Sequence, residues 1–423
     1  MATKYWVNNG GSWGDTSHWD DESGGGGGAL VPTIDDDVAF DGNSFTLSGQ
    51  VVTTAFGGRH AKSLTFNNCL NNPILYLKYS LHIAGDFTLI EDMSVQLEGY
   101  NRSVYIQSGT CNLTSAGHTL SINLGKYSTE STSPTLNLLD DLNFSHLSIN
   151  SGVFNTNDYS ITGGKYSNFS IGNDWYVDQL EIYLGSSTII TEDFYNDSFE
   201  GEVFDAGTSS IKCYKSFEDG AATGSSSEYY NIIFNVSTYD DDTELSFFGS
   251  ITCNNFTINP GFSDAEFGAV WTEDGPIGPA IYAESITMNG SSSQQLLLSS
   301  DWEETPVVFN QESGLVNVYY IQLFDTIAQG GAVFYSLFIN GNLDGGLAWG
   351  NIYPGNNIGW IWELPLYYGK ASYNEGNKIA YAPGMSGGTP VWDIDKTKGE
   401  VYPITDTHTP CGYWYKVKGV LIE

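Results

Sequence analysis

A short phrase that recurs along the chain constrains the fold more than any other feature of the sequence. Each copy places apolar residues at its second and fourth positions and an asparagine at its fifth. The copies occupy residues 63–67, 119–123, 146–150, 231–235, 255–259, 285–289 and 336–340. Apolar residues at every second position predict a strand with one buried face, and asparagine is typical of the turn that follows it. The sequence therefore predicts many short strands, each ending in a similar turn.

Longer matches indicate the length of the repeating unit. Residues 106–112 match residues 149–155 at an offset of 43, and residues 185–189 match residues 207–211 at an offset of 22. These offsets are close to two units and one unit of about 20–25 residues, which is the range of solenoid repeats. A β-solenoid would stack the inward apolar side chains of successive units and join the corner asparagines by hydrogen bonds. Roughly 300 residues stacked at about 4.8 Å per unit would give a rod about 60–70 Å long.

An uneven distribution of charge predicts a domain boundary near Leu364. The chain carries 15 basic and 50 acidic residues, a net charge of −35. Residues 364–423 hold six of each, so the preceding part holds nine basic and 44 acidic residues. This last part is also rich in aromatic residues in short alternating stretches, which are typical of strands. We expect a solenoid repeat region over residues 51–363 and a small β module over residues 364–423 that serves in assembly or anchoring.

The first 50 residues have a composition of their own. Trp6, Trp13 and Trp19 stand among glycines and aspartates, and a run of five glycines follows at 24–28. The glycine run is too flexible for a strand and predicts a loop. Because the terminal unit of a solenoid needs a cap, we expect the tryptophans to close its open end, with residues 1–50 as an N-terminal cap.

The acidity of the chain excludes several classes of partner. Its negative field would repel phosphate backbones, which argues against nucleic-acid binding, and its few lysines argue against docking on anionic lipid. No run of 18 apolar residues occurs, and residues 1–13 lack the basic and apolar regions of a secretory signal peptide. We therefore expect no membrane insertion, and synthesis in a cytoplasm without the ordinary secretion route.

The five cysteines predict neither a disulfide framework nor a zinc site. Their number is odd, their spacings are wide and no C-x-x-C motif occurs. They are Cys69, Cys111, Cys213, Cys253 and Cys411. Buried free thiols are the expected arrangement, which fits folding in a reducing cytoplasm.

No motif for catalysis occurs in the sequence. There is no nucleophile elbow, P-loop, Rossmann fingerprint or H-E-x-x-H pattern, and the six histidines follow no ligand spacing. Neighbouring carboxylates at 140–141, 240–242 and 393–395 are candidates for glycan cleavage, but adjacent residues on one strand point to opposite faces. Solvated turn residues are the favoured interpretation. No catalytic, cofactor-binding or metal-binding residue is assigned, and the chain is not predicted to be an enzyme.

Acidic runs raise the alternative of a structural calcium ion. Residues 35–37 with Asp41, and residues 240–242 with Glu244, offer several oxygen ligands to a hard cation. Neither run follows the EF-hand pattern. Ordinary acidic turns are therefore favoured, and no cofactor is predicted, with structural calcium kept as the alternative.

Three tryptophans are candidates for stacking on sugar rings. Trp271 lies in a stretch that predicts a protruding loop, and Trp302 and Trp349 are placed similarly. Packing inside the protein is the commoner role of tryptophan, so these residues are ligand-stacking candidates only if their rings are exposed.

Several stretches of the chain resemble a group of known surface proteins. These are residues 5–7, 11–13, 17–19, 31–33, 36–41, 204–211, 330–332 and 356–362. They resemble β-helical phage virion and tail-fibre-like proteins, and also bacterial surface proteins of the adhesin or autotransporter type. The resemblance implies a right-handed parallel β-helix, or a related β-sandwich array, and a place on a virion or a cell surface. The motifs are structural, so the resemblance implies no catalytic residue.

These features together predict a bacteriophage virion structural protein of fibre, spike or decoration type. Virions assemble in the host cytoplasm, which agrees with the absence of a signal peptide. The expected partners are other virion subunits, further copies of the chain, as in the trimers common among such fibres, and a glycan or receptor on the host surface. Two alternatives stay open, a polysaccharide-degrading tailspike and a bacterial cell-surface adhesin.

Overall fold

The computed structural model describes most of the chain up to residue 337 and five short strands beyond it. The described residues are 2–56, 59–99, 102–125, 133–172, 180–197, 202–220, 228–235, 244–268, 270–272, 275–291, 296–300, 305–319, 321–323, 325–337, 360–363, 372–374, 379–381, 392–395 and 400–403. Among them a single 3-10 helix, η1 (Thr16–His18), interrupts a structure of strands and turns. The predicted all-β class is confirmed. Within the same residues no helix is long and apolar enough to cross a membrane.

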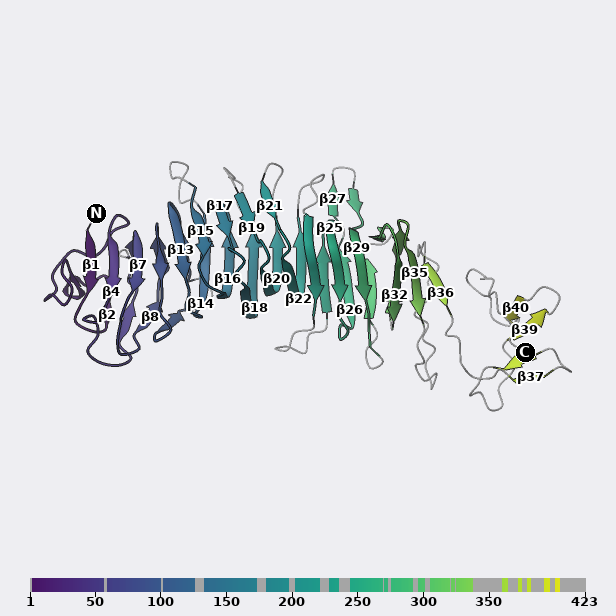
Figure 1. Ribbon diagram of the computed structural model, residues 1–423, viewed down its shortest axis with the longest axis horizontal. Coiled ribbons are helices and arrows are strands. Elements are labelled where there is room, and N and C mark those ends of the chain that lie inside the picture. The colour runs from purple at the N-terminus through teal and green to yellow at the C-terminus, as the bar shows by residue number, and fades with distance from the viewer. Residues whose placement is uncertain are drawn as a thin grey trace.

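Most strands pair in parallel, and the paired strands follow one another along an elongated molecule (Figure 1). We call the first row of strands ladder A. It consists of β1 (Thr3–Trp6), β4 (Asp37–Phe40), β7 (Ser63–Phe66), β10 (Phe87–Thr88), β13 (Thr110–Thr114), β15 (Thr135–Leu138), β17 (Gly152–Asn155), β19 (Leu180–Tyr183) and β21 (Val203–Asp205). The short strand β3 (Trp19–Asp20) pairs with β1 in the antiparallel sense and ends the row.

Two further rows run beside ladder A. Ladder B consists of β2 (Gly11–Ser12), β5 (Val51–Thr53), β8 (Ile74–Leu77) and β11 (Ser94–Leu97). Ladder C consists of β6 (His60–Ala61), β9 (Leu81–Ile83), β12 (Val104–Ile106), β14 (Thr119–Leu124), β16 (Leu142–Ile149), β18 (Ile161–Ile171), β20 (Thr188–Asn196) and β22 (Ser210–Asp219). From β4 to β12 the chain visits A, B and C in turn three times, and we call one such passage a circuit.

Beyond β22 the strands form two connected rows. Strand β22 pairs through residues 210–213 with β23 (Glu228–Phe234) and through residues 216–218 with β24 (Glu244–Phe248). The first row continues with β25 (Ile251–Ile258), β29 (Ala280–Met288), β31 (Val307–Asn310) and β34 (Thr326–Gln329). The second row continues with β26 (Asp264–Gly268), β30 (Leu296–Ser300) and β33 (Ile321–Leu323).

Three smaller sheets complete the described strands. An antiparallel hairpin of β27 (Val270–Thr272) and β28 (Gly275–Ile277) lies between β26 and β29 in the chain. A parallel sheet contains β32 (Leu315–Tyr319), β35 (Val333–Leu337) and β36 (Trp360–Glu363). An antiparallel sheet contains β37 (Ser372–Asn374), β38 (Ile379–Tyr381), β39 (Trp392–Asp395) and β40 (Glu400–Pro403). The domain boundaries near residues 50 and 364 stay predictions.

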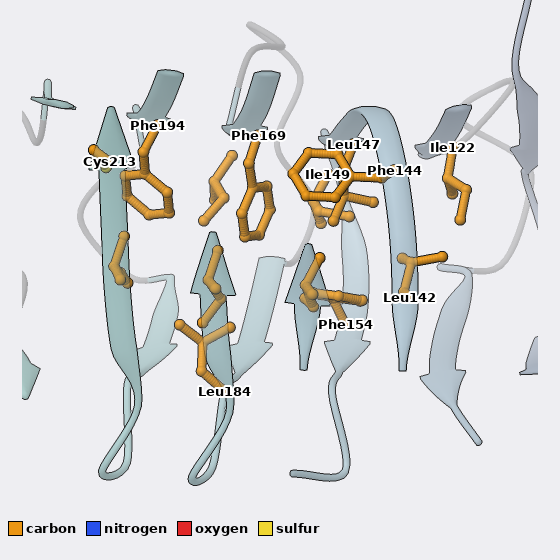
Figure 2. Packing of buried hydrophobic residues seen from close by; sticks show 14 of the residues in the cluster. Ile122, Leu142, Phe144, Leu147, Ile149, Phe154, Phe169, Leu184, Phe194 and Cys213 are labelled. Carbon is orange, nitrogen blue, oxygen red and sulfur yellow. The ribbon is translucent and has the colours of Figure 1, made fainter. Parts of the chain in front are cut away.

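The core is a continuous row of apolar side chains stacked from strand to strand. One column of register partners is fully buried along its whole length. It consists of Val104, Ile122, Leu147, Phe169, Phe194, Phe217, Phe247 and Phe267. Figure 2 shows part of it, with Ile122, Leu147, Phe169 and Phe194 one after another. Each buried phenylalanine contributes about 1.5–3 kcal/mol relative to an exposed one, so the column is a main source of stability.

The repeat offsets seen in the sequence correspond to steps along the ladders. Asn112 pairs with Asn137, which pairs with Asn155, so the offset of 43 spans two steps. The offset of 22 is one step, from β20 to β22. At this step Gly185 and Gly207 both have a positive φ, of 54° and 55°. A Cβ on Gly207 would lie 2.4 Å from the carbonyl oxygen of Gly185, so both the backbone conformation and the close approach require glycine there.

Asparagine side chains join successive strands, as the sequence predicted. Asn255 donates from Nδ2 to Oδ1 of Asn231 at 2.7 Å, and Asn259 donates to Asn235 at the same distance. The recurring phrase does not always set the register, however. Asn123 and Asn150 end equivalent copies, yet Asn123 lies opposite Ser148. The pairing of these two strands shifts register between Leu120 and Ser121 and places Ile122 opposite Leu147.

The three N-terminal tryptophans precede the first circuit and are fully buried. The Trp19 ring packs edge-on against Trp6 and Trp13, with centroids 4.9 Å apart in both pairs. Phe40 continues the cluster and stacks on Phe66 at 4.3 Å. The tryptophans thus begin the apolar core at its N-terminal end, in agreement with the burial that a cap requires.

Candidate ligand-binding site

The tryptophans proposed for sugar stacking cannot define a site in the described structure. Trp302 and Trp349 lie outside the described residues. Trp271 belongs to β27, where its backbone pairs with Pro276, and its side chain lies outside the described part. Their role in ligand binding stays a prediction.

Asp140 and Asp141, the carboxylate pair within the described residues, accept hydrogen bonds from backbone groups of neighbouring turns. Asp140 accepts hydrogen bonds from the backbone N–H groups of Ser115, at 2.7 Å, and Ala116, at 2.6 Å. Asp141 accepts one from the N–H of Ser160 at 2.8 Å. The two carboxylates therefore accept hydrogen bonds from different neighbouring turns. Residues 240–242 and the side chains of 393–395 lie outside the described residues.

In the acidic run at 35–37 and at Asp41, carboxylates also accept hydrogen bonds from neighbouring protein groups. Asp36 accepts hydrogen bonds from the N–H and Oγ1 of Thr33, at 3.0 and 2.8 Å. Asp41 accepts from Ser23 Oγ at 2.5 Å and from the N–H of Asn43 at 2.9 Å. In the described part of the chain no group of three or more histidine, cysteine or acidic side chains is placed to hold a metal ion.

Four cysteines are buried free thiols, as predicted. They are Cys69, Cys111, Cys213 and Cys253, while Cys411 lies outside the described residues. Burial raises the pKa of Cys69, Cys111 and Cys253 to about 12. These thiols stay protonated at neutral pH and are poor nucleophiles.

The only two arginines of the chain meet at one corner of the molecule. The Cζ atoms of Arg59 and Arg102 each lie 5.6 Å from the ring centroid of Tyr79. Arg59 also lies 5.9 Å from the ring of Phe56. Such cation–π contacts contribute about 0.5–1 kcal/mol each at exposed sites. We call Phe56, Arg59, Tyr79 and Arg102 the arginine corner.

Each circuit brings one part of the arginine corner to the same edge. Phe56 and Arg59 lie between β5 and β6, Tyr79 lies between β8 and β9, and Arg102 lies between β11 and β12. All four residues thus lie where the chain passes from ladder B to ladder C. Three successive circuits are needed to assemble the corner.

Hydrogen bonds from the Thr54 hydroxyl and between backbone groups hold the turns that carry these side chains. The hydroxyl of Thr54 is fully buried, donates to the carbonyl of Tyr79 at 2.6 Å and accepts from its N–H at 2.9 Å. The carbonyl of Arg59 accepts from the N–H of His82 at 2.9 Å. The first two circuits are therefore tied together at the corner, which limits the movement of its side chains.

A row of rings lies next to the arginine corner on ladder C. His60 and His82 have centroids 4.8 Å apart, and His82 stacks on Tyr105 at 5.3 Å. Nδ1 of His82 lies 3.0 Å from Oε1 of Gln107. Burial lowers the pKa of His60 and of His82, and the charge of Arg59 lowers both further. The imidazoles are therefore mostly neutral at pH 7 and provide hydrogen-bonding groups beside the two cations.

The guanidinium groups lack carboxylate partners in the described structure. The ion pairs among the described residues are Lys4 with Asp21 and Lys62 with Asp37. The Nε atoms of Arg59 and Arg102 are buried and make no hydrogen bond. Two like charges beside one ring repel each other, and the described residues provide no carboxylate counterion for them, although the chain has a net charge of −35.

No protein-family model matches the chain, and neither a curated protein nor a solved structure matches it. The function is therefore argued from the fold and from the chemistry of the arginine corner.

The sequence interpretation missed the arginine corner because it searched for tryptophans and paired carboxylates. One signal was available. Arg59 and Arg102 are the only arginines and are 43 residues apart, the offset that corresponds to two repeating units. Because this separation equals two repeating units, it predicts that the two arginines lie near each other. The contribution of Phe56 and Tyr79, in contrast, depends on how the turns fold.

Proposed function

We propose that the protein is a rod-shaped structural component of a bacteriophage particle, of fibre or spike type, which attaches to a glycan on the host surface. In this proposal the circuits form a right-handed parallel β-helix. Support comes from the order of visits to ladders A, B and C and from the stacked core column. The proposed partners are other virion subunits, further copies of the chain in a trimer, and the host glycan.

The arginine corner is the observation that carries the attachment role. A purely structural rod gains little from two unpaired cations beside an exposed aromatic ring. Phe56 is 82% exposed, although a phenylalanine has no polar group to compensate for contact with water. An exposed aromatic ring next to hydrogen-bond donors is typical of surfaces that bind sugars, because the ring packs against the apolar face of a sugar.

The virion role is tested by locating the chain on particles. Gold-labelled antibody against the purified protein should decorate intact particles at symmetry-related positions in electron micrographs. Particles purified from a strain with the gene deleted provide the control for antibody specificity. Absence of label from intact particles that carry all their other proteins would contradict the virion role.

The attachment role is tested separately with the purified full-length chain. Labelled protein should bind host cells and compete with particles for adsorption. Periodate oxidation of the cell surface, which cleaves the vicinal diols of sugars, should abolish binding, whereas protease treatment of the cells should not. Binding that survives periodate but not protease would contradict a glycan receptor.

A further inference from the structure

We propose that the arginine corner binds the carboxylate of an acidic sugar, held by Arg59 and Arg102, with the sugar ring against Phe56. This inference rests on the attachment function proposed above and specifies its ligand as a uronic-acid-containing glycan. It follows from three properties of the corner, namely its charge, its geometry and its exposed ring.

The positive charge of the arginine corner favours binding of an anion. Arg59 and Arg102 have no carboxylate partner in the described residues, and their Nε atoms make no hydrogen bond. A bound carboxylate would neutralise the repulsion between the two guanidinium groups.

The geometry of the corner suits a small planar anion. Both Cζ atoms lie 5.6 Å from the centroid of the same ring, that of Tyr79, so both cations contact one aromatic side chain. Guanidinium groups bind carboxylates through paired N–H donors with a fixed direction, which is the reason arginine is favoured over lysine at such sites. A single carboxylate has two oxygens, enough to accept from both arginines.

The aromatic side chains indicate that the anion is part of a sugar. Phe56 is exposed, and its ring lies 5.8 Å from that of Tyr79 in an edge-on arrangement, so the pair provides an apolar surface beside the cations. A sugar ring has one face of C–H groups that packs on such a surface. His82 and Gln107 lie on the neighbouring row, where Nδ1 of His82 is 3.0 Å from Oε1 of Gln107.

The negative charge of the rest of the chain disfavours binding of densely charged polyanions at the corner. A nucleic acid carries a charge every few ångströms and would meet the field of a chain with net charge −35 on either side of the corner. A uronic-acid-containing glycan has one carboxylate per acidic sugar, separated by neutral parts, so only one charge needs to lie at the corner.

The test measures binding of digalacturonate, an oligogalacturonate with only two carboxylates, to the full-length chain by titration calorimetry. The controls are the same oligosaccharide with its carboxyl groups reduced to alcohols, a sulfated oligosaccharide of equal length, and inorganic phosphate. We expect binding of the oligogalacturonate and no measurable binding of the reduced form. Equal binding of the two forms would overturn the proposal, and so would tighter binding of the sulfated sugar or of phosphate alone.

Variants then test the assigned residues. Arg59→Gln and Arg102→Gln should each weaken binding of the oligogalacturonate about tenfold or more, as expected for loss of a charged hydrogen bond. Phe56→Ala should weaken it less, and Lys165→Gln is the matched control, because Lys165 makes a cation–π contact with Tyr166 away from the corner, at 4.7 Å. Circular dichroism and melting temperature verify that each variant is folded. Unchanged binding by folded Arg59→Gln and Arg102→Gln would overturn the proposal.

The same variants separate this inference from the attachment function. If the folded double variant Arg59→Gln/Arg102→Gln still binds host cells in a periodate-sensitive manner, the glycan-binding function stands and the acidic-sugar site is wrong. If the unchanged chain fails to bind host cells yet binds oligogalacturonate through the arginines, the site stands and the attachment function is wrong.

Discussion

Phe217 in the core column contacts several other aromatic rings. The ring of Phe217 stacks on Phe194 at 5.1 Å and on Phe247 at 5.4 Å, and it packs edge-on against Tyr229 at 5.4 Å. Removing this ring would leave a cavity between successive strands, because the neighbours on both sides are held by their own ladder hydrogen bonds.

We therefore expect Phe217→Ala to lower the free energy of unfolding by about 3–5 kcal/mol. Denaturant titration followed by tyrosine and tryptophan fluorescence measures the change. Phe56→Ala is the matched control, because Phe56 is 82% exposed and its removal should cost less than about 1 kcal/mol. Equal losses in the two variants would contradict the packing described for Phe217.

Buried histidines make stability depend on pH. Burial lowers the pKa of His146 below its ordinary value of 6.5. As the pH falls through 6.5, the unfolded chain therefore takes up a proton that the folded chain does not. The contribution of His146 to stability is greatest above pH 6.5 and decreases as the pH falls through this range.

A comparison with His146→Gln isolates this contribution from the other titrating groups. The free energy of unfolding of the original chain, relative to that of the variant, should decrease between pH 7.5 and pH 5.5. Denaturant titrations at several pH values within this range measure the difference. A difference that is constant with pH would show that His146 has the same pKa in both states.

At the scale of the strand, asparagine side chains supplement the backbone pairing. Asn231 accepts from Asn255 and itself donates to Ser210 Oγ at 2.8 Å, so one chain of amide and hydroxyl groups crosses three strands. Each such bond contributes about 0.5–1.5 kcal/mol net. The bonds also favour one register, because a shift of one residue would bring the asparagines to the opposite face.

Asn255→Asp should lower the free energy of unfolding by about 1–2 kcal/mol, because it removes the Nδ2 donor to Asn231 and adds a negative charge. Asn67→Asp is the control, since Asn67 belongs to another copy of the phrase but is exposed. It should change stability by less than about 0.5 kcal/mol. Thermal melting at pH 7 compares the two, and equal effects would contradict a role for the amide bond.

At the scale of the whole molecule, the dominant electrostatic feature is self-repulsion. The chain has a net charge of −35, and the described residues contain only two ion pairs. An elongated shape spreads these charges, but neighbouring circuits are only about 4.8 Å apart. Repulsion between like charges on adjacent strands therefore opposes folding at low ionic strength.

Added salt should stabilise the protein. Between 10 and 150 mM NaCl the screening length falls from about 30 to about 8 Å, so we expect the melting temperature to rise by about 2 °C or more. Scanning calorimetry in a series of NaCl concentrations measures the shift. A melting temperature that falls with salt would mean that attractive charge pairs outweigh repulsion.

Residues 364–423 are expected to act in assembly and not in folding of the ladders. A chain that ends at residue 363 should keep the circular dichroism and melting temperature of the parallel-strand region but should not enter particles. Complementation of a deletion strain with the shortened gene, followed by analysis of purified particles, tests this. Normal incorporation of the shortened chain would assign the assembly contact elsewhere.

The sequence by itself determined the local properties of this protein. Alternation of apolar residues determines strands, because side chains on a strand alternate between two faces. The offset between Asn112 and Asn155 determined the length of the repeat, and the odd, widely spaced cysteines indicated buried thiols. These properties depend on residues that are near in sequence, or on a spacing that the sequence repeats.

Only the tertiary structure decided which distant residues meet. Asn123 lies opposite Ser148 instead of Asn150, and Ile122 lies opposite Leu147, in a pairing whose register shifts between Leu120 and Ser121. The arginine corner likewise exists only when three circuits are stacked, since Arg59, Tyr79 and Arg102 come from three successive turns between ladders B and C. The physical reason is that turns of different length can occupy the same corner of stacked circuits. The separation of two residues in the sequence therefore does not show whether they meet in space.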